Sequence, residues 1–185
     1  HDGMSAIAAQ HQAGKVDIDA IASAGQKQMF DALSAYDSSF DGLQYAGEQA
    51  ALVEGLLRGF YKVGWPALIK EYPKILAFEK KLVYNHDASG KYDPKGRFEF
   101  VAKPDLVLAN DDGAVYVEFK STSSKKDQWI NSWNTAVQVH TGGRVIEKCL
   151  DIPVQGVIVQ GFYKGYIAYN KLSSPICYAY QRSGN

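Results

Sequence analysis

The stretch KPDLVLANDDGAVYVEFK, residues 103–120, decides the fold. Its centre, residues 110–113, has the Asn, Asp and Gly composition of a turn between two antiparallel strands. If the turn is symmetric about its midpoint, Asp105 lies opposite Glu118, with Cβ atoms about 4.5–5.5 Å apart. Lys120 is two residues further along and shares their face. A three-residue loop would instead shift the pairing by one residue and require a bulge.

The two faces of this hairpin differ in chemistry. One face carries two carboxylates and an amine, and the other carries an apolar row: Leu106, Leu108, Val115, Val117 and Phe119. Alternation with a period of two is typical of strands that bury one face. The hairpin is therefore predicted to bury the apolar row and to present the charged residues together.

Two carboxylates at this spacing repel each other unless a cation lies between them. Hard oxygen ligands of this kind suit Mg²⁺ or Mn²⁺. A lysine beside such a cation can orient a water molecule and stabilise charge on a phosphate. The pattern is therefore compatible with phosphodiester hydrolysis, and the alternative is a surface hairpin whose charges are simply solvated.

On the N-terminal side of the hairpin, apolar periodicity predicts a helix over 43–62, and strands are predicted after it. Strands are expected over 75–85, 97–109, 114–121 and 154–163, with shorter ones over 166–170 and 176–182. Helical stretches are expected over 125–150, interrupted at Gly142 and Gly143. The predicted fold class is α/β, a mixed sheet with helices packed on it.

Length and composition limit the remaining possibilities. The 185 residues suit a partly helical arm over 1–40 and one domain over 41–185. Residues 1–3, which precede Met4, are either a tag remnant or part of the natural chain. With 20 basic and 20 acidic residues, the chain does not bind polyanions by bulk charge, so any such site is a local patch or uses metal ions.

Cysteine use and hydropathy indicate the compartment. Cys149 and Cys177 are too few for a four-cysteine zinc or iron–sulfur site, and we expect them to be reduced thiols. No apolar run approaches the ~18 residues of a membrane span, and no secretion signal is visible. A cytoplasmic protein without membrane attachment is the expectation.

Pro104-Asp105 followed by Glu118-Phe119-Lys120 resembles the PD-(D/E)XK motif of the restriction-endonuclease-like nuclease superfamily. The flanks extend the resemblance to RecB-like and phage exonucleases over residues 43–182. The matching segments are the strand 75–79, the helix 129–133 with Gln138, and the closing strands 154–165 and 174–180. The resemblance implies a three-layer α/β fold around a mixed sheet. It also implies a Mg²⁺- or Mn²⁺-dependent deoxyribonuclease, an exonuclease of DNA end processing or recombination in a phage or prokaryotic cell.

Matched by position, the family's site residues fall on the same hairpin. Asp105, Glu118 and the backbone carbonyl of Phe119 would bind the metal, and Lys120 would position the attacking water. Gln138 would lie near the metal or touch the DNA backbone. Four residues after Gln138 the family has a tyrosine, whereas this chain has Gly142.

The sequence leaves open which residue upstream of the hairpin would lie near the metal. RecB-like members have histidine four residues after a helical glycine, but here Ala51 follows Gly47. Glu54 is the first acidic candidate on that helix, with Glu48 second and a solvated helix face as the alternative. Glu79 either approaches the metal or pairs at the surface with a neighbouring lysine.

The segment after the hairpin offers candidate phosphate contacts, with a solvated loop or helix surface as the alternative. These residues are Ser121, Thr122, Lys125, Lys126 and Arg144. The cysteine cluster of the CRISPR adaptation exonucleases is absent, so no iron–sulfur cluster is expected. DNA is the expected partner, with a homo-oligomer or a recombination protein as further possibilities. The competing functions are a structure-specific or restriction-type endonuclease and a catalytically inactive nucleic-acid-binding or regulatory module.

Overall fold

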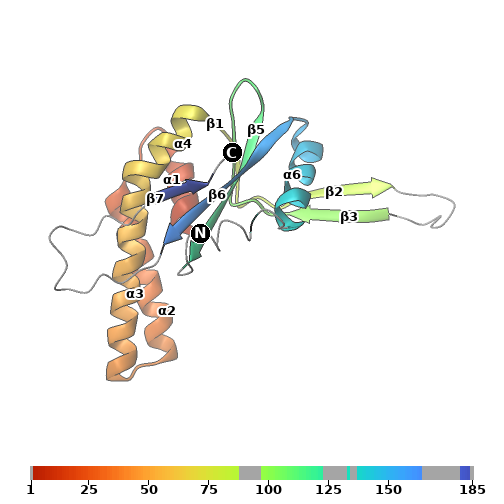
Figure 1. Cartoon of the computed structure of the whole chain (residues 1–185). Coiled ribbons are helices and arrows are strands. Elements are labelled where there is room, and N and C mark those ends of the chain that lie inside the picture. The colour runs from red at the N-terminus through yellow and green to blue at the C-terminus, as the bar shows by residue number, and fades with distance from the viewer. Residues whose placement is uncertain (1, 88–96, 123–132, 134–136, 164–179, 184–185) are drawn as a thin grey trace. The chain divides into compact units, whose positions relative to one another are not determined.

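A computed structural model describes residues 2–87, 97–122, 133, 137–163 and 180–183 (Figure 1). The chain forms two compact units. The first comprises residues 1–70 and 162–181, and the second comprises residues 71–161 and 182–185. Within the described ranges, no helix is both long enough and apolar enough to cross a membrane.

The first unit is mainly helical. Its elements are α1 (Asp2–Gln12), α2 (Ile18–Tyr36), α3 (Phe40–Gly59), a π-helical turn η1 (Phe60–Gly64) and the start of α4 (Trp65–Glu71). Side-chain oxygens cap two of these helices: Asp17 accepts from Ala20 N–H at 3.0 Å, and Ser39 accepts from Gly42 N–H at 3.1 Å. The helix expected over 43–62 is confirmed as α3 and the turn that follows it.

The second unit contains the sheet. Its strand order is β1 (Lys74–Phe78), β4 (Leu106–Ala109), β5 (Ala114–Thr122), β6 (Val154–Tyr163) and β7 (Tyr180–Ser183). β4 is antiparallel to both β1 and β5, whereas β5 and β6 run in the same direction (Figure 1). The helix α6 (Val137–Leu150) lies in the connection between β5 and β6. The sheet is therefore mixed and the chain is α/β, as the sequence predicts.

Two predicted strands are each divided in the structure. The segment 75–85 becomes β1 and β2 (Leu82–Asp87), and 97–109 becomes β3 (Arg97–Ala102) and β4. β2 and β3 pair with each other in a separate two-stranded sheet. The breaks fall where Glu79 adopts a positive φ of 48° and where Pro104 lacks an N–H for a ladder. Both breaks coincide with short polar stretches of the sequence, residues 79–81 and 103–105.

The symmetric pairing expected around the turn is confirmed. Leu106 pairs with Val117 and Ala109 with Ala114, and Asn110 N–H donates to the Gly113 carbonyl at 3.0 Å. The Asn110 side chain also accepts from the N–H groups of Asp112 and Gly113, at 3.0 and 3.2 Å. This side-chain turn fixes the loop and thereby the register of the hairpin.

Both faces of the hairpin are buried. The apolar row predicted for the core is buried at Leu106, Leu108, Val115, Val117 and Phe119. On the carboxylate face, the half nearest the turn is also core, with Val107, Ala109, Ala114 and Tyr116 packed with Val145 and Ile146 of α6. The charged residues therefore occupy only the end of that face furthest from the turn.

The interruption predicted at Gly142 and Gly143 is wrong, since α6 runs through both glycines. A Cβ on Gly142 would lie 2.8 Å from Cε1 of Tyr116, whereas a Cβ on Gly143 would lie 3.6 Å from Val154 Cγ1. Gly142 thus permits close approach of the helix to β5. Packing of the helix outweighs the low helix propensity of glycine here.

This packing predicts different outcomes at the two glycines. Gly142→Ala is expected to lower the free energy of unfolding by roughly 1–3 kcal/mol, because the buried Tyr116 ring must move. Gly143→Ala, the matched control, has room and is expected to be neutral or to stabilise by up to about 1 kcal/mol. Urea unfolding of both variants tests this, and equal effects at the two positions would contradict the packing account.

Candidate active site

Asp105 and Glu118 lie side by side at the end of the β4–β5 hairpin. Asp105 directly precedes β4, and one of its carboxylate oxygens, Oδ2, accepts the backbone N–H of Phe119 at 2.7 Å. The exposed fraction is 8% for Asp105 and 2% for Glu118, which is unusual for carboxylates. The predicted pairing of these residues across the hairpin is therefore confirmed, and the pair is buried rather than solvated.

Lys120 contacts the same pair. Its ammonium forms an ion pair with Glu118 Oε2, as expected for residues two positions apart on one strand face. Oε2 is fully buried, and the Lys120 ammonium is its partner among the described residues. One carboxylate oxygen is thus removed from water with only partial compensation.

Burial raises the pKa of both carboxyl groups above their ordinary values. For Asp105 the largest effect is desolvation, opposed by the Phe119 N–H and by the charge of Lys120. For Glu118 it is again desolvation, opposed by the Lys120 hydrogen bond and reinforced by the charges of Asp105 and Glu79. The single ammonium of Lys120 therefore does not fully offset the cost of holding two buried anions.

Glu79 is a third acidic residue near this pair. It lies in the turn between β1 and β2, and its N–H donates to the backbone carbonyl of Asp105 at 3.2 Å. Its carboxylate forms an ion pair with Lys103. The sequence suggests a lysine adjacent to Glu79 as its partner, whereas this ion pair is with Lys103, which directly precedes Pro104-Asp105.

The residues present fit a hard divalent cation. Among the described residues, no group of three or more His, Cys, Asp or Glu side chains is arranged to hold a metal ion. Mg²⁺, however, needs only one or two protein carboxylates, because it keeps several of its waters. A cation between Asp105 and Glu118 would neutralise two buried anions whose charge the single ammonium of Lys120 offsets only in part. The carbonyl of Phe119 as a further ligand stays a prediction.

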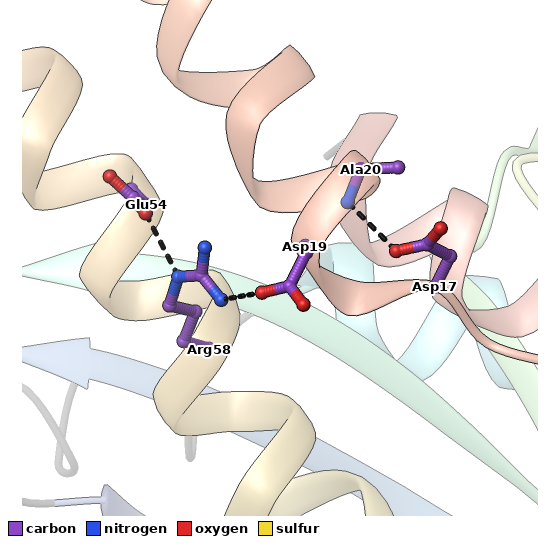
Figure 2. Close-up of polar contacts among 5 residues, drawn as sticks. All are labelled: Asp17, Asp19, Ala20, Glu54 and Arg58. Atoms are coloured by element: carbon purple, nitrogen blue, oxygen red, sulfur yellow. Dashed lines mark hydrogen bonds and ion pairs between the residues drawn. The ribbon is translucent and has the colours of Figure 1, made fainter.

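The acidic candidates on α3 have protein partners in the first unit. Glu54 pairs with Arg58 one turn later at 2.9 Å, and Arg58 also bonds Asp19 of α2 (Figure 2). Both bonds raise the pKa of the Arg58 guanidinium. Glu48 accepts from Gln44 at 3.3 Å. For Glu54 to bind a metal it would have to leave this network, so metal binding by either residue stays a prediction.

The remaining candidates are placed only in part. Gln138 lies in the first turn of α6, and Ser121 is exposed near the end of β5, which Thr122 closes. Arg144 is exposed on α6 and donates to Glu147 at 2.9 Å. Lys125 and Lys126 lie outside the described residues. The roles of these six residues at the metal or the DNA stay predictions.

The buried pair predicts a stability that falls as pH rises. Because the folded pKa of Glu118 is raised above its ordinary value of 4.5, ionisation above the folded pKa destabilises the protein. Glu118→Gln has the shape of the neutral acid and is therefore expected to increase the free energy of unfolding at pH 8 by on the order of 1 kcal/mol. The gain should shrink as the pH approaches 4.5, and urea unfolding across this range measures it.

Glu147 supplies a control of opposite sign. Hydrogen bonds from Arg144 and from Val154 N–H lower the pKa of Glu147, so its ionised form stabilises the fold. Glu147→Gln is expected to destabilise at pH 8, with the difference disappearing as the pH falls through the lowered pKa. A Glu118→Gln protein that is less stable than wild type at pH 8 would contradict the account of the buried pair.

Comparison with protein-family models and with curated proteins finds no match for this chain.

Proposed function

We propose that this chain is a Mg²⁺- or Mn²⁺-dependent nuclease that hydrolyses phosphodiester bonds in DNA. The observation that carries the proposal is the buried pair of Asp105 and Glu118, with Lys120 in an ion pair with Glu118. Buried charges held at this cost are typical of functional sites. A pair kept only for stability would be better replaced by apolar residues.

Each residue of the site would have a separate role. Asp105 and Glu118 would hold the cation, with the carbonyl of Phe119 as a further oxygen ligand. When bound, the cation supplies charge neutralisation on the phosphate and lowers the pKa of a bound water. Lys120 would orient the attacking water and stabilise charge in the transition state. Water is the nucleophile, so no covalent intermediate with the protein is needed.

The finer fold assignment belongs to the same proposal. A three-layer restriction-endonuclease-like arrangement is supported by a mixed sheet whose β4 and β5 are buried on both faces. Pro104-Asp105 directly precedes β4, and Glu118-Phe119-Lys120 lies on the adjacent strand β5, which supports the match to the motif. Exonuclease action in DNA end processing follows from the resemblance to RecB-like and phage enzymes.

Digestion of linear duplex, closed circular and single-stranded DNA with Mg²⁺, Mn²⁺ or EDTA tests the proposal. We expect loss of linear DNA only with metal. Lys120→Ala is expected to lower the rate of DNA cleavage by about 10²-fold or more. This is the loss typical of removing one group that stabilises the transition state. Lys148→Ala, an exposed lysine of α6, is the matched control and should retain activity.

The other results of this digestion distinguish between the competing functions. Cleavage of the closed circle would identify an endonuclease of the same fold. DNA binding without metal-dependent cleavage would overturn the catalytic proposal and leave a binding or regulatory module. Because Lys120 also pairs with Glu118, circular dichroism must establish that the Lys120→Ala protein is folded before its rate is interpreted.

A further inference from the structure

The ion pair between Lys103 and Glu79 lies next to the buried acids but is far more accessible. The side chain of Lys103 is 59% exposed and that of Glu79 is 24% exposed. Lys103 precedes Asp105 by two residues in the connection from β3 to β4, and Glu79 lies in the connection from β1 to β2. The pair therefore joins the two segments where the chain leaves and re-enters the main sheet.

The backbone of Glu79 is held in place while its carboxylate turns towards Lys103. Its N–H donates to the Asp105 carbonyl at 3.2 Å, and its φ of 48° lies in a region that residues other than glycine rarely adopt. Such strain persists only where the surrounding structure enforces it, and it is concentrated at functional sites. Rotation of the side chain is thus the available way to move the Glu79 carboxylate.

The Glu79 carboxylate is also coupled electrostatically to the buried pair. Its charge raises the pKa of both Asp105 and Glu118. Without a cation, two carboxylates and one ammonium give this site a net negative charge that repels Glu79, whereas a bound divalent cation would make the net charge positive and attract Glu79. Lys103 and such a cation therefore compete for one carboxylate.

We propose that Lys103 is a metal-responsive phosphate-binding residue. A divalent cation at Asp105 and Glu118 draws the Glu79 carboxylate away from Lys103, and the freed ammonium then contacts the DNA backbone beside the site. This inference rests on the proposed nuclease function and adds a coupling between metal and DNA to it. A flexible, exposed lysine is suited to this role, because phosphate contacts need a positive charge rather than a fixed geometry.

This coupling predicts that Lys103→Gln raises the affinity for Mg²⁺ and lowers the metal-dependent affinity for DNA. With isothermal titration calorimetry and Mg²⁺ alone, Lys103→Gln is expected to bind the cation about fivefold more tightly, because the competitor is removed. Lys81→Gln, an exposed lysine of the same β1–β2 turn, makes the same change in net charge and is the control. If Lys81→Gln gained the same affinity for Mg²⁺, the effect would come from the change in net charge alone, and the inference would be overturned.

DNA affinity supplies the second measurement. Fluorescence anisotropy with a short duplex is compared in Ca²⁺, which prefers the same oxygen ligands as Mg²⁺, and in EDTA. We expect metal to strengthen wild-type binding, and Lys103→Gln to lose about fivefold or more of that enhancement while binding equally in EDTA. In Ca²⁺ the slope of log affinity against log salt should fall by about 1, as for the loss of one phosphate contact.

A double-mutant comparison identifies the partner. In a Glu79→Gln background, Lys103→Gln should no longer change Mg²⁺ affinity, because there is no carboxylate to compete for. Unchanged DNA affinity in Lys103→Gln, or an equal loss with Ca²⁺ and EDTA, would overturn the role of Lys103 while leaving the nuclease proposal intact. A wild-type protein that binds neither Mg²⁺ nor DNA would overturn both.

Discussion

The hydrogen bond from Phe119 N–H to the Asp105 carboxylate connects the two strands at the point where the candidate site lies. It requires the symmetric register of β4 and β5, which the Asn110 side chain sets at the opposite end of the hairpin. A slip of one residue would turn Glu118 to the opposite face and bring apolar side chains to the site. The chemistry at one end of the hairpin thus depends on the turn at the other.

Burial gives this arrangement its chemical character. The sheet has core on both faces, so the end that carries Asp105 and Glu118 shares a surface with Tyr116 and the residues of α6. Desolvation raises the pKa of both acids, and Lys120 offsets the cost only in part. The buried charges are therefore destabilising for the fold, as is typical of functional positions.

Helix α6 packs closely against the sheet because residue 142 is a glycine and not a residue with a larger side chain. Gly142 leaves space for the Tyr116 ring. A larger residue there would hold α6 away from the sheet, and β2 and β3 also contact this helix. The glycine at this position is thus accounted for by packing.

The sequence by itself determined the hairpin, its register and the meeting of Asp105, Glu118 and Lys120, because turn chemistry and a period of two act over neighbouring residues. It also determined the α/β class and the helix α3. Only the tertiary structure decided the breaks at Glu79 and Pro104, the continuity of α6 through Gly142, and the pairing of Lys103 with Glu79. The last two depend on contacts between segments distant in the chain, which override local propensity.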